Sequence, residues 1–267
     1  MSYQMESILS KCEMEDYKFI IGQVDSYINL TDDQKLKEAF LSYSAQKSIS
    51  TKLILINLIE ADIRYLGSSD IAYFKRKLFS NNNPPGVDID EIINDVSDKL
   101  KVKQKLVGTV ESKLERLVKA TVEKTFFSLS PNQQRELFDK AGVDKKQQDD
   151  FFEKLSRNKA HFLPLLLSIL GPQITKSIIE GIVVSVITVY IGREAAKELI
   201  KNLATRFPWW AEWLGPIVWG LSLGWLALDL QGPAYRKTIP ILLYLGIVGL
   251  RDGPEDGEAF WNEAGEI

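Results

Sequence analysis

Apolar residues recur at intervals of three and four through the first 160 positions. In the segment "MEDYKFIIGQVDSYI", Tyr17, Ile20 and Val24 share one side of a helical projection. A second stripe comprises Leu114, Leu117, Val118 and Val122. This spacing is typical of amphipathic helices. The sequence contains no strictly alternating segments joined by Asn-Gly or Gly-Gly turns, so the pattern predicts an all-α fold.

Residues suited to helix ends support this prediction. In "SPNQQRELFDKAG", Ser130 is placed to cap a helix, Pro131 occupies its first position and Gly142 follows its end. The apolar segment "SISTKLILINLIEADIRYLG" closes on Gly67, as a central buried helix with a glycine cap would. The polar segment "SNNNPPG" at 80–86 predicts a loop or hinge.

The pattern changes near residue 160. Only 19 of the 69 charged residues lie beyond it, and four uncharged stretches follow one another at 160–175, 181–192, 213–228 and 238–250. The longest contain 16 residues, whereas a helix that crosses a bilayer needs about 20. The sequence therefore predicts a multi-helical N-terminal domain followed by a glycine- and tryptophan-rich apolar helical region with short helices.

Four parts are expected along the chain. They are an N-terminal helical subdomain at 1–80, a central helical subdomain at 87–160, the apolar helical region at 161–251 and an acidic flexible tail at 252–267. Phe260 and Trp261 are the aromatic residues of the tail. They provide a means of docking onto the body of the protein or onto a partner.

Three interpretations of the apolar region remain open: membrane contact, the core of a soluble domain, and an apolar surface for a partner. Tryptophans suited to the headgroup boundary, the small residues Gly220 and Gly224 and a basic amphipathic segment at 192–210 favour the first. The residues expected to contact membrane or partner are Trp209, Trp210, Trp213, Trp219, Trp225, Lys197, Lys201 and Arg206.

Composition argues against several classes of function. The net charge of −3 provides no overall attraction for nucleic acid, so we expect no nucleic-acid partner. Cys12 and His161 are the single cysteine and histidine, which excludes an internal disulfide and a Cys/His zinc site of more than two ligands. Phosphate-binding, dinucleotide-binding and nucleophile-elbow motifs are missing. We therefore expect no enzymatic activity and no cofactor.

Two charged segments have competing explanations. The acidic residues of "VDIDEIINDVSD" include Asp88 and Asp95 and offer oxygen ligands for a metal, but the spacing and glycine of a calcium loop are missing. Acidic residues in the first turn of an amphipathic helix explain this segment better, so we predict no metal site. The lysines of "DKLKVKQK" are similarly explained as a solvated helix end.

Several segments together resemble a known family. They are "YLGSSDIAYFKRK", "INDVSDKLKVK", "SPNQQRELFDKAG", "FLPLLLSIL" and "GPAYRKTIPILLYLGIVGLR". Their order and spacing resemble the bacterial YaaW family, whose central region has been compared with ubiquinol–cytochrome c chaperones. The most specific part of the resemblance comprises Ala234, Tyr235, Arg236, Thr238, Ile239 and Pro240. The family implies homology and fold but no activity, and the tryptophan-rich stretch at 208–225 departs from it.

These observations lead to one functional hypothesis and one alternative. In the first, a non-catalytic effector or adaptor binds an unknown protein partner through its N-terminal part and a lipid bilayer through its apolar region. It would be cytoplasmic and peripheral to, or partly inserted in, the cytoplasmic membrane. In the alternative, a soluble chaperone-like helical scaffold uses its apolar segments as its own core or as a groove for a client.

Overall fold

The computed structural model describes residues 4–24, 33–67, 87–103, 105, 107–191, 195, 197, 199, 201 and 235–263. All regular elements in these ranges are helices, which confirms the all-α prediction, and no strand occurs among them. The α-helices are α1 (Glu6–Ser10), α2 (Met14–Val24), α3 (Asp33–Gln46), α4 (Ile49–Leu66), α6 (Ile89–Leu100), α7 (Val110–Ser128), α8 (Pro131–Lys140), α9 (Lys145–Arg157), α10 (Phe162–Ile191), α13 (Tyr235–Gly249) and α14 (Glu258–Asn262). The short 3-10 helices are η1 (Lys159–His161) and η2 (Leu250–Asp252).

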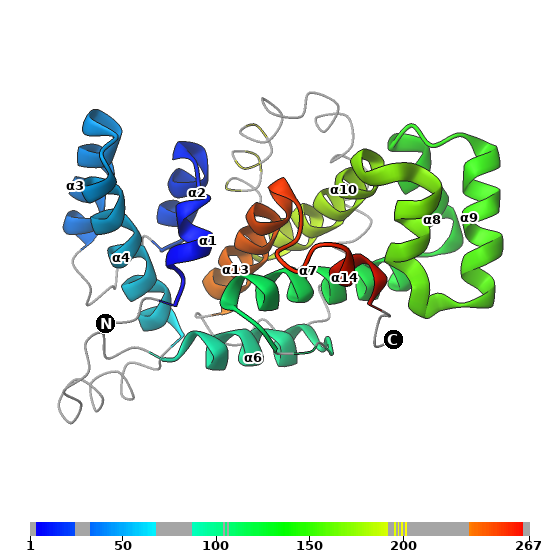
Figure 1. Cartoon of the computed structure of the whole chain (residues 1–267), viewed down its shortest axis with the longest axis horizontal. Coiled ribbons are helices and arrows are strands. Elements are labelled where there is room, and N and C mark those ends of the chain that lie inside the picture. The colour runs from blue at the N-terminus through cyan, green and yellow to red at the C-terminus, as the bar shows by residue number, and fades with distance from the viewer. Residues whose placement is uncertain are drawn as a thin grey trace.

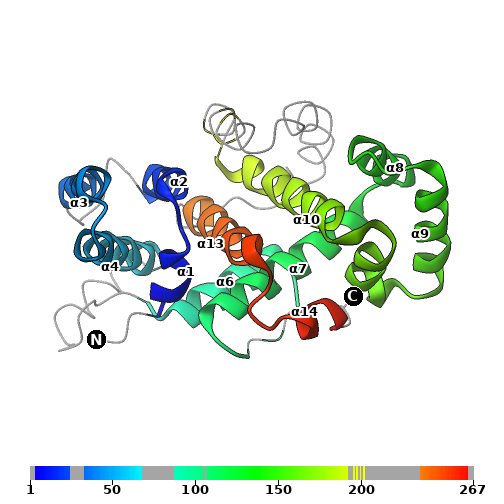
Figure 2. The same cartoon turned by 45° about the horizontal axis from the view of Figure 1, so that its top comes forward.

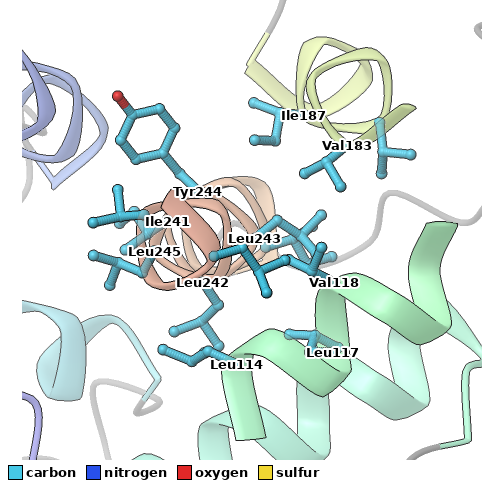
Figure 3. Close-up of a cluster of buried hydrophobic side chains, with 14 of the residues drawn as sticks. Leu114, Leu117, Val118, Val183, Ile187, Ile241, Leu242, Leu243, Tyr244 and Leu245 are labelled. Carbon is cyan, nitrogen blue, oxygen red and sulfur yellow. The ribbon is translucent and has the colours of Figure 1, made fainter. Parts of the chain in front are cut away.

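Helix α13 lies at the centre of the molecule. Helices α1 to α4 occupy one end, α8 and α9 occupy the other, and α6, α7 and α10 lie around α13 between them (Figures 1 and 2). Figure 3 shows Leu242 directed towards Leu114 of α7, and Leu243 lying between α7 and the α10 residues Val183 and Ile187. All five side chains are buried. The core therefore joins residues from both sides of position 160, although the composition changes there.

Helices α7 and α13 approach each other closely at Gly246. A β-carbon at this position would lie 2.5 Å from Cγ2 of Val118 and 2.6 Å from the backbone oxygen of Leu114. Real β-carbons do not tolerate such distances. The absence of a side chain at Gly246 is thus what lets the two helices pack at this separation.

Helix α10 is two helices joined at a kink. Gly171 has φ +76° and ψ 170°, a conformation accessible to glycine, and Pro172 follows it. Before the kink, Phe162 packs in an aromatic cluster with Phe126 of α7, with ring centroids 4.5 Å apart, and with Phe151 of α9. After the kink, nearly every residue from Ile178 to Tyr190 is buried.

One span among the described residues has the length and hydropathy of a membrane-crossing helix. It runs over Lys159–Ile191 and its most apolar window has a mean hydropathy of 1.8. However, 72% of that window is buried inside the protein. The core helix of a soluble protein has the same length and hydropathy, so this span is weak evidence for a membrane-crossing helix.

Helix ends follow the local sequence signals. Ser130 and Gln133 form a reciprocal capping box at the start of α8, with Pro131 in the first turn, and Gly142 after its end has φ +72°. Gly67 ends α4 as predicted, but with a right-handed φ of −70°. Gly67 packs closely against Ile92, because a β-carbon there would lie 2.5 Å from Cγ1 of that side chain, which would have to move. The predicted loop at 80–86 lies outside the described residues.

Candidate functional site

A pocket of about 430 Å³ lies beside the kink of α10, where this helix meets η2 and α14. Lys176, Ile179 and Glu180 line it from α10, Ile247 from α13 and Trp261 from α14. Its volume falls within the range of small-molecule sites, and its wall is mostly apolar with a few polar groups. We take this pocket as the candidate functional site.

Glu180 is the unusual group in this pocket. The residue is only 5% exposed, and no described residue donates a hydrogen bond to its carboxyl group. Burial raises the pKa of Glu180 to about 7, against an opposing effect of the charges on Lys176 and Arg251. A buried carboxyl group with a pKa near neutrality, in a cavity, is a feature of functional sites.

The basic groups of the pocket are already engaged within the protein. The Lys176 ammonium group donates to the backbone oxygen of Arg251. Nη2 of Arg251 donates to both carboxylate oxygens of Asp16 at 2.9 Å. Asp16 is fully buried and also accepts from the Tyr244 hydroxyl at 2.8 Å and from the Glu13 backbone at 2.7 Å. This network fixes η2 against α2 and so holds one wall of the pocket.

Residues 253–263, here called the C-terminal strap, form another wall. The strap lies along α7, where the Glu255 backbone donates to Oε2 of Glu115 at 3.0 Å and Lys119 Nζ donates to the backbone oxygen of Phe260 at 3.1 Å. Phe260 is 1% exposed, and its ring meets Trp261 edge-on with centroids 5.0 Å apart. The expected flexible tail is thus docked over its described length, and this docking places Trp261 beside the pocket.

Helix α7 buries a row of charged residues at intervals of one turn, two of which bond to the strap and one to α1. They are Glu111, Glu115, Lys119 and Glu123, each no more than 5% exposed. Desolvation by burial raises the pKa of both Glu115 and Glu123 to about 7. The sequence pattern identified only the apolar stripe of this helix and did not predict the burial of its charged residues. The available signal was the four-residue spacing of charges combined with a tail of acidic and aromatic residues.

The residues expected to contact membrane or partner lie mostly beyond what the structure describes. Those outside the described residues are Trp209, Trp210, Trp213, Trp219, Trp225 and Arg206. Lys197 and Lys201 are helical and exposed. The structure therefore does not bring these residues together into a described site, and their role remains a prediction.

The six-residue motif of the family resemblance opens the central helix. Ala234 lies outside the described residues, and α13 begins at Tyr235. Arg236 is exposed, whereas the residues that follow Lys237 are buried: Thr238, Ile239 and Pro240. Thr238, Ile239 and Pro240 thus pack in the core, and their role is structural.

The residues considered for metal binding or catalysis do not lie together in one site. Among the described residues, no group of three or more His, Cys, Asp or Glu side chains is placed to hold a metal ion. Asp88 instead caps α6 by accepting from the Asp90 backbone at 2.9 Å, which confirms the helix explanation. His161 is exposed in η1, and Cys12 is buried, with its sulfur 3.9 Å from the Ile8 oxygen.

One comparison with known proteins gives a match. The chain is 24% identical over 193 residues to the "UPF0174 protein" of Helicobacter pylori strain J99, which covers 72% of this chain and 70% of that protein. It is thus similar to a member of an uncharacterised family. No family model and no solved structure matches the chain.

Proposed function

We propose that the protein is a non-catalytic helical adaptor whose folded scaffold presents the tryptophan-rich segment to a membrane. The observation that carries this proposal is the antiparallel packing of α10 and α13. Leu243 lies near Val183 and Ile187, whereas Arg251, beyond the end of α13, bonds to Lys176. The end of α10 at Ile191 and the start of α13 at Tyr235 therefore lie at the same end of the pair (Figure 2).

This geometry separates the apolar region into two roles. The described helices α10 and α13 are buried against α7 and α2 and have little apolar surface left for lipid. In this proposal the membrane is therefore contacted by the sequence between α10 and α13, which contains five of the six tryptophans. The exposed Lys197 and Lys201 within that sequence and Arg236 just after it supply charges suited to anionic headgroups.

The protein partner of this proposal binds the hairpin of α3 and α4. Large apolar side chains are exposed there: Leu41 at 65%, Ile49 at 81%, Leu53 at 37% and Ile54 at 54%. In an antiparallel hairpin that turns at 47–48, Leu41 and Leu53 lie at a similar distance from the turn. Such grouped apolar exposure is typical of interaction surfaces.

Flotation with anionic liposomes tests the membrane role. We expect the full chain to float with the vesicles, and a variant with residues 206–232 replaced by a short Gly/Ser linker to remain in the soluble fraction. The matched control is the double variant Ile49→Ser, Leu53→Ser, which removes apolar surface from α4 and should still float. Full-length protein that stays with the soluble fraction without detergent eliminates the membrane proposal.

The burial of α10 and α13 favours a second candidate, a soluble chaperone-like scaffold whose apolar helices form its own core. The two functions predict different fluorescence behaviour. A scaffold would show a blue-shifted tryptophan emission that does not change when vesicles are added. A membrane adaptor would show a further blue shift on addition of vesicles, because its tryptophans would leave water for the headgroup boundary.

We further propose that the relationship to the H. pylori protein extends to the YaaW family. The buried position of Thr238, Ile239 and Pro240 at the start of α13 supports this, since a motif that sets the central helix would be retained with the fold. Cytoplasmic location at the inner face of a bacterial membrane is part of the same proposal.

A further inference from the structure

We propose that the pocket beside the α10 kink binds a small organic cation, an amine that carries an apolar group. The inference is independent of the membrane proposal, because it rests on the described residues of α10, η2 and the C-terminal strap. Three features carry it: a buried carboxyl group without a donor, basic groups that are already bonded, and an apolar wall that includes an indole.

Glu180 supplies the anchor. Its side chain lines the pocket, the residue is 95% removed from solvent, and no described group donates to it. The carboxyl oxygens of Glu180 are not among the fully enclosed atoms that lack a partner, so they reach the space of the pocket. A donor for them therefore has to come from what fills the pocket. A ligand that brings N–H donors into the pocket would provide the missing partner.

The charges around the pocket favour a cationic ligand over an anionic one. Lys176 is bonded to the Arg251 backbone oxygen, and the Arg251 guanidinium is bonded to Asp16. By contrast, Asp252 at the rim forms no ion pair with any described residue. Lys176 keeps its positive charge, because its bond is to a neutral carbonyl oxygen, but the carboxyl groups of Glu180 and Asp252 outnumber it. An ammonium group complements the carboxyl group that is left over.

The rest of the wall suits an apolar substituent. Pro172 and Ile179 of α10, Ile247 of α13 and Trp261 of the strap contribute apolar surface. An indole face also attracts an ammonium group, which adds a second interaction for the same end of the ligand. The volume of about 430 Å³ accommodates an alkyl or aryl amine.

The test uses three matched probes: hexylamine, hexan-1-ol and hexanoate. Their binding to the full-length protein would be measured by ligand-detected saturation-transfer NMR titration at neutral pH. We expect hexylamine to bind at least about tenfold more tightly than the alcohol or the acid, because only the amine can pair with Glu180. Equal or tighter binding of hexanoate, or no detectable binding of hexylamine, overturns the proposal.

Two variants locate the binding. Glu180→Gln removes the charge at nearly constant volume and should weaken hexylamine binding by at least about tenfold without changing the binding of hexan-1-ol. Ile247→Trp fills the pocket and should abolish the binding of both probes, which provides a readout that does not depend on the charge change. Glu258→Gln, an exposed carboxyl group of α14, is the control and should bind as the native chain does. Unchanged hexylamine affinity in a folded Glu180→Gln variant would falsify the site.

Discussion

Buried carboxyl groups connect distant parts of this chain. Asp16 joins α2 to η2 through Arg251 and to α13 through Tyr244. Glu60 of α4, fully buried, accepts from the backbones of Gln4 and Met5 at 3.0 Å. Removing one partner from such a contact leaves an unsatisfied charge, which costs more than the contact itself contributes. These residues therefore fix which helices lie against each other.

Glu123 yields a prediction about pH. Its Oε1 is buried without a hydrogen-bond partner, and burial raises its pKa from 4.5 to about 7. Between pH 4.5 and about pH 7, this carboxyl group is therefore protonated in the folded state and ionised in the unfolded state. The free energy of unfolding consequently falls as the pH rises through this range. Glu123→Gln cannot ionise, and its stability relative to the native chain should increase by up to about 3 kcal/mol between pH 4.5 and pH 8.

Urea denaturation across this pH range measures the effect of Glu123→Gln. The Glu38→Gln variant, which changes an exposed carboxyl group of α3, controls for the loss of one titratable side chain. If the stability difference between Glu123→Gln and the native chain does not change with pH, the carboxyl group titrates alike in both states and the argument from burial is wrong.

At the scale of the elements, the contact between α7 and α13 depends on Gly246. Gly246→Ala should destabilise the protein by about 1–3 kcal/mol, because the added methyl group meets the Leu114 backbone, which cannot rotate away. Gly22→Ala in α2 is the matched control. No atom lies within 4 Å of a β-carbon at Gly22, so that change should stabilise the protein by about 0.5–1 kcal/mol. Chemical denaturation compares both variants, and equal effects would contradict the close-packing explanation.

Sequence periodicity predicts the elements better than their partners. The stripe on α7 and the cap at Ser130 depend on neighbours within a few residues, and both are found. The burial of Glu115 and Lys119 depends on a strap more than 130 residues away, and the four-residue spacing of these charges does not by itself identify that partner. The pocket was missed for the same reason, since its wall combines α10, η2 and α14.

At the scale of the whole molecule, the core does not divide where the composition does. Leu114 and Val118 of α7 are fully buried, in a packing that includes α10 and α13. A fragment of residues 1–160 lacks both partners and would expose the apolar stripe of α7. We expect this fragment to unfold without a cooperative transition, as monitored by circular dichroism during thermal denaturation.

The chain with residues 206–232 replaced by a linker is the control for this fragment, because it retains α10 and α13. It should show a cooperative transition close to that of the native chain. A cooperative transition in the 1–160 fragment would mean that its helices form a sufficient core alone.

The shared end of the antiparallel pair α10 and α13 has a consequence for evolution. Because the scaffold already holds Ile191 and Tyr235 at one end, an insert between them need only close a loop, and each doubling of a flexible loop's length costs about 0.6 kcal/mol. Relatives can therefore lengthen, shorten or exchange this stretch while the helices keep their packing. Descendants of one ancestral scaffold would then share a core and differ in what they attach to.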